Sequence, residues 1–271
     1  MTRALIVFML TVLSGFAQLA PEQLWMQMAS IKRAAGGAPP AGCDEYTMTM
    51  LHMDGTNAQN SLTDDGVSRT WRVVGSALSD TNKEFGTASL QISGTGDAPD
   101  STPSLIASPD SADFDFGAGD FTVDMWIFTK ALSGHCIAWG QIDSGSYAPV
   151  RMDIPGTGVP TFYGSTSGGG FEFCSGYAAS NALAAGTWTH VALVRNGNEL
   201  LQFVNGNRSA TAVDVTGKTL YNASTEWQIG GSIYGAATNY CGRFFVDEFR
   251  ISKGIARWTA NFTPSNAPYC E

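Results

Sequence analysis

One segment of the chain, GTWTHVALVRNGNELLQFVNGN at residues 186–207, restricts the possible fold more than any other. Side chains over 188–194 alternate with a period of two, which is typical of a β-strand. The Asn-Gly pair at 196–197 favours a tight hairpin because both residues tolerate positive φ, and the apolar run at 200–204 supplies the returning strand. A second Asn-Gly pair at 205–206 turns the chain again. The segment therefore predicts an antiparallel β-hairpin.

The same alternation recurs along the chain after residue 43. In residues 121–128, one face takes Phe121, Val123, Met125 and Ile127, and the other takes Thr122, Asp124, Trp126 and Phe128. Because the second face carries two aromatic side chains, we expect it to line a concave surface. Further strands are expected at 135–142, 148–154, 160–164, 170–177, 226–230 and 243–251.

The composition agrees with many short strands. Charged residues make up 14% of the chain and there are 31 glycines, whereas an average domain is about 25% charged. Long helices need more Lys, Glu and Leu than this chain provides. Antiparallel strands joined by Gly and Asn turns predict an all-β sandwich or barrel.

The net charge of −9 limits the partners of the chain. A nucleic-acid phosphate backbone would be repelled, so we expect no nucleic-acid binding. There is also no basic cluster that would hold the chain on anionic lipid.

The cysteines lie at 43, 136, 174, 241 and 270, without a Cys-x-x-Cys motif, so neither a zinc site nor a thioredoxin-like site is indicated. Scattered cysteines in an exported protein favour disulfides. A bridge between Cys43 and Cys270 would join the two ends of the β region, and the pairing of Cys136, Cys174 and Cys241 stays open. The alternative is a reduced protein in which all five are small buried residues.

The N-terminus resembles an export signal. Arg3 precedes an apolar run that extends to Leu13, and small residues at 15 and 17 fit cleavage before Gln18. The run is shorter than the about 20 residues of a membrane helix, so no stable span is expected. Residues 1–17 are therefore interpreted as a signal peptide or, alternatively, as a retained hydrophobic helix.

Residues 18–42 are expected to connect this segment to the β region. A short helix is predicted over 21–33, with Pro21 at its start. Residues 34–42, AAGGAPPAG, are typical of a linker. The predicted organisation is therefore 1–17, 18–42 and a β domain over 43–271.

Several motifs resemble a known family. They are LHMDG (51–55), EFGTASLQI (84–92), PDSADFDFGAGDFTVDMWI (109–127), GTWTHVALVRNG (186–197), LQFVNG (201–206) and VDEFRISKGIARWTANFTP (246–264). In this order they resemble a laminin-G-like jelly-roll domain of the concanavalin A-like lectin/glucanase superfamily. The resemblance implies two stacked antiparallel sheets, a jelly-roll sandwich, with the first and last strands adjacent. It does not identify a ligand, because this fold hosts lectins, hydrolases and structural modules.

The resemblance also implies a structural calcium ion near the junction of the first and last strands. Matched residue by residue, Asp54 of LHMDG and Asp247 of VDEF are the candidate ligands. Ca²⁺ prefers six to eight oxygens, which carboxylates and backbone carbonyls supply. The alternative is that Asp54 caps a turn before Gly55 and that Asp247 is an ordinary strand residue.

An enzyme is not expected. Glycoside hydrolases need two carboxyl groups that flank the scissile bond, and no Glu begins a Glu-x-Asp pattern along a strand. Asp247 and Glu248 are consecutive, so a regular strand would point them to opposite faces. His190 is interpreted as a structural residue, and no hydrolase or phosphate-binding motif occurs.

Aromatic side chains with polar neighbours are the candidates for sugar binding, because sugars stack on rings and hydrogen-bond through their hydroxyls. The candidates are Trp126, Trp139, Asp143, Tyr147, Tyr163 and Tyr234. The alternative is that most of these rings belong to the core of the sandwich.

Together these features predict a non-catalytic module that binds a carbohydrate or another cell-surface ligand and that is secreted or displayed. The alternative is a structural virion component, a decoration or fibre protein on the virion surface, assembled with other proteins through its N-terminal segment. Retention of residues 1–17 would favour the second hypothesis.

Overall fold

The computed structural model describes these stretches of the chain: 43–59, 61–67, 69–92, 104–132, 135–142, 148–232 and 244–270. The predictions made for residues 1–42 and for Cys241 lie outside the described residues. Within the described residues, no helix is long and apolar enough to cross a membrane.

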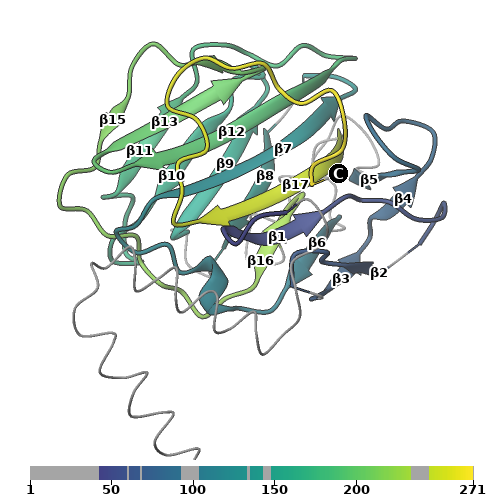
Figure 1. The fold of residues 1–271 in the computed structure, drawn as a ribbon, viewed down its shortest axis with the longest axis horizontal. Coiled ribbons are helices and arrows are strands. Elements are labelled where there is room, and N and C mark those ends of the chain that lie inside the picture. Colours follow the sequence, from purple (N-terminus) through teal and green to yellow (C-terminus); the bar gives the residue numbers. More distant parts are fainter. Residues whose placement is uncertain are drawn as a thin grey trace, which may run out of the picture. The chain divides into compact units, whose positions relative to one another are not determined.

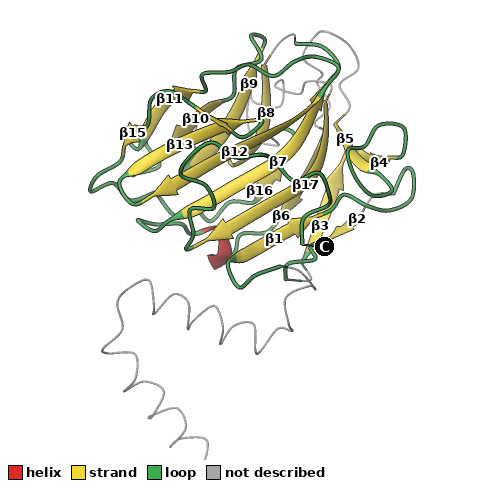
Figure 2. Ribbon diagram, turned by 45° about the horizontal axis from the view of Figure 1, so that its top comes forward, coloured by secondary structure: helices red, strands yellow, loops and turns green. Residues whose placement is uncertain are grey.

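Two antiparallel sheets lie face to face, as Figures 1 and 2 show. The first sheet has nine strands: β1 (Thr47–Leu51), β4 (Ala77–Ser79), β5 (Ser89–Ile92), β7 (Phe121–Thr129), β12 (Trp188–Asn196), β13 (Glu199–Val204), β14 (Asn207–Arg208), β15 (Val213–Asp214) and β17 (Phe244–Lys253). The second sheet has eight strands: β2 (Ser61–Thr63), β3 (Thr70–Val74), β6 (Leu105–Ser108), β8 (His135–Gln141), β9 (Val150–Pro155), β10 (Thr161–Gly164), β11 (Cys174–Ala178) and β16 (Trp227–Ile229). A short 3₁₀ helix, η1 (Ala112–Phe114), precedes β7.

This architecture confirms the predicted all-β, two-sheet sandwich. The hairpin predicted for residues 186–207 is formed by β12 and β13, with Asn196 paired to Glu199 across the turn. The first and last described strands, β1 and β17, pair as predicted. In the first sheet the order runs β14-β13-β12-β7-β17-β5-β4, so β7 and β17 are central.

The core lies between the sheets. Phe121, Val123, Met125 and Ile127, which share one face of β7 in the predicted alternation, are all buried. On the second sheet, Trp139 stacks on Trp227 with ring centroids 5.6 Å apart. Burial of such large apolar side chains is the main favourable contribution to folding.

The opposite face of β7 is covered, so it does not line the concave surface that the sequence predicted. Thr122 and Asp124 are fully buried, and Trp126 is 8% exposed. The cause is the C-terminal strap, residues 254–270, which crosses this face of the first sheet as the yellow segment of Figure 1. Trp258 and Phe262 of the strap stack on each other and pack against the apolar side chains of β12 and β13.

Polar contacts hold the strap at both ends. Near its start, the Arg257 guanidinium makes two hydrogen bonds of 2.8 and 3.0 Å to the Asp44 carboxylate. At its end, a disulfide joins Cys270 to Cys43. The strap also approaches Gly206 so closely that a Cβ there would overlap the Phe262 carbonyl, and Gly206 has φ of 73°. The second Asn-Gly turn, at residues 205–206, therefore reverses the chain and also leaves room for the strap to pack against it.

A buried ion pair lies beneath the strap. The Arg250 guanidinium of β17 donates to both carboxylate oxygens of Asp124 on β7, at 3.1 and 2.9 Å, and its Cζ lies 4.2 Å from the centre of the Tyr269 ring. His190 Nε2 lies 3.4 Å from the same carboxylate. Burial alone would raise the pKa of Asp124, but Arg250 and His190 together hold it well below its usual value.

We expect replacement of Asp124 by Asn to destabilise the fold by about 3–5 kcal/mol, because it leaves the Arg250 charge buried without a counter-charge. Urea unfolding monitored by circular dichroism measures this. Because the folded pKa of Asp124 lies below the unfolded value of about 4, the stabilisation is complete above that pH and is lost as the pH falls below it. The matched control is Asp113→Asn, which breaks a partly exposed pair with Arg69 and should cost about 1 kcal/mol or less. Equal losses of stability in the two variants would contradict the role of Asp124 as the counter-charge of the buried Arg250.

The disulfide closes a sequence separation of 227 residues, so its loss should release much chain entropy in the unfolded state. We expect the double variant Cys43→Ser/Cys270→Ser to lose about 2–4 kcal/mol, which lowers the melting temperature by on the order of 10 °C. A reductant should lower the melting temperature of the parent protein and leave that of the double variant unchanged. A reductant effect of equal size in both proteins would show that another bond is responsible.

Candidate functional site

Asp247, one of the two predicted calcium ligands, is fully buried in β17. Its Oδ2 accepts hydrogen bonds from the backbone N–H groups of Glu84, at 2.9 Å, and Phe85, at 3.1 Å. Its Oδ1 accepts a third bond, of 3.0 Å, from the N–H of Glu248. Asp247 therefore fastens the loop at residues 84–88 to the last strand of the first sheet.

Asp54, the second predicted ligand, is exposed and contacts the other end of the same loop. Its Oδ1 accepts hydrogen bonds from the Thr87 backbone N–H, from Thr87 Oγ1 at 2.9 Å and from the Ala88 N–H at 3.2 Å. Gly86 has φ of 56°, and a Cβ there would collide with the Asp54 carboxylate. The motif EFGTA thus needs its glycine because two carboxylates bracket the loop.

Glu248 interrupts the regular pleat that the sequence predicted for residues 247 and 248. The register of β17 against β7 shifts between Asp247 and Arg250, and Glu248 has φ of 51°, in the left-handed region. Such a bulge places an extra residue in one strand and re-aims its side chain. Both carboxylates are consequently buried, although they bind different partners.

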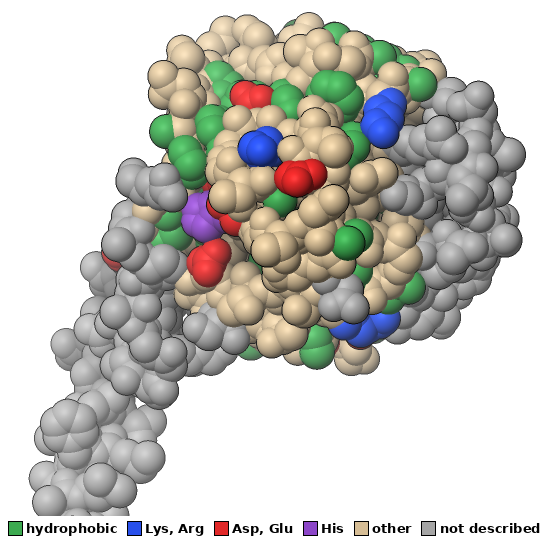
Figure 3. Space-filling view, turned by 90° about the vertical axis from the view of Figure 1, so that its right-hand side faces the viewer, with side chains coloured by type: hydrophobic (Ala, Val, Ile, Leu, Met, Phe, Trp, Pro, Cys, Tyr) green, Lys and Arg blue, Asp and Glu red, His purple; other side chains and the backbone are tan. Residues whose placement is uncertain are grey.

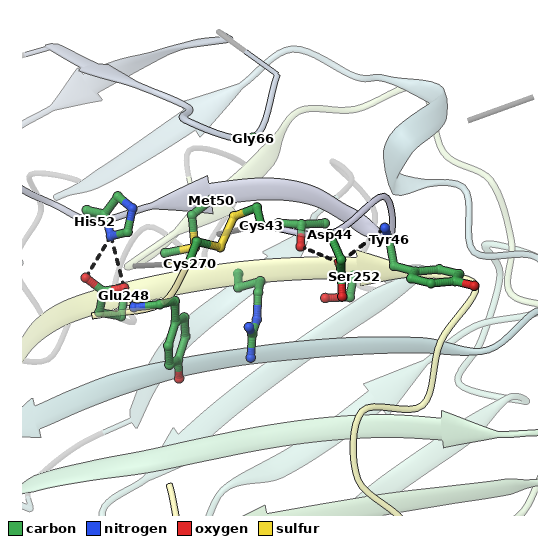
Figure 4. The surroundings of a disulfide bond; sticks show 12 residues. Cys43, Asp44, Tyr46, Met50, His52, Gly66, Glu248, Ser252 and Cys270 are labelled. Atoms are coloured by element: carbon green, nitrogen blue, oxygen red, sulfur yellow. Dashed lines mark hydrogen bonds and ion pairs between the residues drawn. A yellow bond between two sulfur atoms is a disulfide. The ribbon is translucent and has the colours of Figure 1, made fainter. Parts of the chain in front are cut away.

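Glu248 contacts two segments: His52, directly after the first strand, and Tyr269, near the end of the strap. As Figure 4 shows, both of its carboxylate oxygens face His52, with Nδ1 at 2.9 Å from Oε1 and 3.1 Å from Oε2. Oε2 also accepts a hydrogen bond of 2.8 Å from the Tyr269 N–H. The hydrogen bond to Glu248 raises the pKa of His52.

Three acidic side chains, Asp54, Asp247 and Glu248, lie near one histidine, His52, where the first and last strands meet. Burial raises the pKa of Asp247 to about 8, and the charges of Glu248 and Asp54 add to the effect although the N–H groups of Phe85 and Glu84 oppose it. Burial also raises the pKa of Glu248. Figure 3 views a face of the molecule on which acidic side chains gather beside a histidine. Among the described residues, neither Asp54 nor Asp247 forms an ion pair with a basic side chain.

These carboxylates do not form a dense metal centre by themselves. Within the described stretches, no three His, Cys, Asp or Glu side chains are grouped so that they could hold one ion. An ion at loop 84–88 would therefore take most of its oxygens from backbone carbonyls and water, which Ca²⁺ accepts.

The structure removes two of the predicted sugar-binding residues from the surface. Trp126 lies under the strap, where it packs with Tyr269 and with Phe85. Trp139 is 1% exposed because its side chain points into the core between the sheets. Neither ring can stack on a sugar, so these two predictions are wrong. Asp143, Tyr147 and Tyr234 lie outside the described residues.

Tyr163 is the predicted aromatic residue that remains at the surface. It is half-buried on the outer face of β10, and its ring lies over Gly176, where an added Cβ would be 3.6 Å from the ring. Phe171 lies beside it, with ring centroids 5.0 Å apart. Arg151 of the neighbouring strand β9 places its Cζ 5.0 Å from the centre of the Tyr163 ring. We call Arg151, Tyr163 and Phe171 the β9–β10 patch.

The sequence contains a signal for this patch besides its aromatic residues. In VRMDIP (150–155), the buried apolar residues alternate with Arg151 and Asp153, so both point away from the core on the same side as Tyr163. Asp153 is nevertheless fully buried, because Arg151 Nε and His135 Nε2 each lie 2.9 Å from its carboxylate. Charged residues inside a strand pattern could therefore have identified this part of the surface.

Comparison with known proteins supports the fold. A family model, Laminin_G_3, described as the concanavalin A-like lectin/glucanases superfamily, matches residues 100–257. No curated protein sequence matches this chain. Among solved structures, the binding domain of Paraclostridial Mosquitocidal Protein 1 superposes with a TM-score of 0.59 at 12% identity, over 78% of this chain and 50% of that one.

Two further structures have the same fold. The binding domain of botulinum neurotoxin serotype G gives a TM-score of 0.54 at 12% identity, over 77% of this chain and 48% of that one. A sialidase of Trypanosoma rangeli in complex with sialic acid gives 0.56 at 10% identity, over 86% of this chain and 36% of the sialidase. This chain thus spans half or less of the length of each of these proteins. With the two-sheet fold and the match of the family model to more than half of its residues, the chain belongs to the concanavalin A-like lectin/glucanases superfamily.

Proposed function

We propose that this chain is a non-catalytic module that binds a carbohydrate or another cell-surface ligand outside the cell. The fold supports this class of function, since the similar solved structures include binding domains of two toxins and a sialidase in complex with sialic acid. The Cys43–Cys270 disulfide supports an oxidising, extracellular location. A role as a virion component depends on residues 1–42, which lie outside the described residues, and stays a prediction.

The observation that carries the proposal is the position of Tyr163. Its ring is held on a strand, over Gly176 and beside the ring of Phe171. Because the side chain is already ordered, binding a ligand costs it little conformational entropy. An aromatic face takes up the C–H face of a sugar, and neighbouring polar groups fix the orientation. The β9–β10 patch supplies both elements.

The burial and the hydrogen bonds of Asp247 and Glu248 support a non-catalytic role. A glycosidase needs two carboxyl groups that reach the substrate from either side of the scissile bond. Asp247 and Glu248 are buried, and each already accepts hydrogen bonds from backbone N–H groups. Both therefore act in joining segments of the chain.

We further propose that Ca²⁺ binds at loop 84–88. Asp54 and Asp247 bracket this loop, and no basic side chain of the described residues pairs with either of them. A bound cation would favour the charged form of Asp247, whose pKa burial raises to about 8. A cation that takes oxygens from both carboxylates, from backbone carbonyls and from water would fit the chemistry of calcium. It would join the first and last strands of the first sheet more firmly.

We expect Tyr163→Ala to weaken binding to any glycan that the parent protein binds by about fivefold or more, because a stacking ring contributes about 1 kcal/mol or more. A glycan array identifies the sugar, and calorimetric titration compares the proteins. The matched control is Tyr221→Ala, an exposed tyrosine that rests on Gly168, which should bind as the parent does. A blank array with the folded parent protein would sink the carbohydrate proposal and favour the structural role.

For calcium, we expect EDTA to lower the melting temperature of the parent protein by several degrees, since a ligand present at about 100 times its Kd stabilises the folded state by about 2.7 kcal/mol. The variant Asp54→Asn/Asp247→Asn should melt at the same temperature with and without EDTA. Asp214→Asn, which alters an exposed carboxylate bonded to Thr216, should respond like the parent. If EDTA has no effect on the parent and elemental analysis finds no calcium, the ion is not bound.

A further inference from the structure

We infer that the β9–β10 patch selects acidic sugars, namely saccharides that carry a carboxylate such as hexuronates. This inference rests on the proposed carbohydrate-binding function and names the class of ligand for the same surface. It is carried by the arrangement of Arg151, Asp153 and His135 around Tyr163.

The Arg151 guanidinium is held in a fixed orientation. Its buried Nε forms an ion pair of 2.9 Å with Asp153 Oδ1, although the two atoms are not aligned as a hydrogen bond. Its Cζ lies 5.0 Å from the centre of the Tyr163 ring and 5.4 Å from that of Phe171. Contacts of this kind orient the guanidinium plane before a ligand arrives, which lowers the entropy cost of binding.

The end of the guanidinium that points away from Asp153 can accept a ligand. Within the described part of the chain, the Nη atoms of Arg151 donate no hydrogen bond, and the side chain is 17% exposed. Two parallel N–H groups at the end of a guanidinium match the two oxygens of a carboxylate. A flat anionic group can therefore bind there without displacing Asp153.

The charged group of the Arg151–Asp153 pair that reaches the surface is the guanidinium, although the chain as a whole carries −9. Asp153, the carboxylate of the cluster, is fully buried, whereas the side chains of Arg151 and His135 are 17% and 36% exposed. His135 Nε2 lies 2.9 Å from the second oxygen of Asp153. Because the negative group is below the surface and the cationic group reaches it, an anion is attracted and a neutral sugar gains nothing from this field.

A hexuronate would contact both parts of the patch at once. Its ring offers C–H groups to the exposed part of the Tyr163 ring, and its carboxylate lies one bond from the sugar ring, on the side of the guanidinium that packs on the same aromatic side chain. A neutral hexose would make the stacking contact and leave the guanidinium without a ligand partner. The difference predicts a preference for the charged sugar.

The test uses two probes that differ in the charge of their carboxyl groups, galacturonate trimer and its fully methyl-esterified form, in calorimetric titration of the full chain. We expect the parent protein to bind the acid at least tenfold more tightly than the ester. Arg151→Gln should abolish this preference and keep the affinity for the ester. Arg72→Gln, which removes an exposed arginine paired with Glu226 on the same sheet, should keep the preference.

A second variant guards against misfolding, because Arg151→Gln leaves Asp153 with His135 as its one described ionic partner. Arg151→Gln/Asp153→Asn removes both charges, and it should also bind the two probes equally. Equal binding of acid and ester by the parent, or a preference that survives in both Arg151 variants, would overturn the inference while carbohydrate binding stands. If the parent binds neither probe nor any glycan, the proposed function and this inference fail together.

Discussion

The buried pair between Asp124 and Arg250 is the interaction on which the arrangement of the first sheet depends. It joins β7 to β17, the two central strands, and the Arg250 guanidinium lies against the Tyr269 ring of the strap. His190 of β12 contacts the same carboxylate and is surrounded by the rings of Trp126, Trp258 and Phe262. The buried charge of Asp124 is tolerated because Arg250 and His190 lie against it. This outer face of the first sheet is therefore suited to being covered by the strap and not to binding a ligand.

This covering explains where a ligand can bind. Once the strap occupies the outer face of the first sheet, the apolar side chains of β12 and β13 become a second small core. The outer face of the second sheet is left to carry aromatic and charged side chains toward solvent, and the β9–β10 patch lies there. The disulfide and the Asp44–Arg257 pair fix the strap at its two ends, so the closed arrangement is part of the fold.

The sequence predicted those parts of the structure that depend on local pattern. Alternation identified the strands around residues 121–128 and 186–207, and the family motifs identified the pairing of the first and last strands. It failed for Trp126, because the ring lies under a strap that is distant in sequence, and for Trp139, because alternation does not say which of two aromatic faces is the core. It missed the bulge at Glu248, since the left-handed backbone there is set by tertiary contacts to His52 and Tyr269. It also missed Arg151, whose proposed role follows from its contacts with Tyr163 on β10 and with Phe171 in the segment before β11.

The central claim is that ligands meet this protein on the outer face of the second sheet and not on the first. A crystal structure of the protein with a bound saccharide tests it most directly. We predict a sugar ring in van der Waals contact with the Tyr163 ring and polar contacts to Arg151, with the strap still closed over Trp126. A sugar bound between the strap and β12, in contact with Trp126 or Trp258, would contradict it.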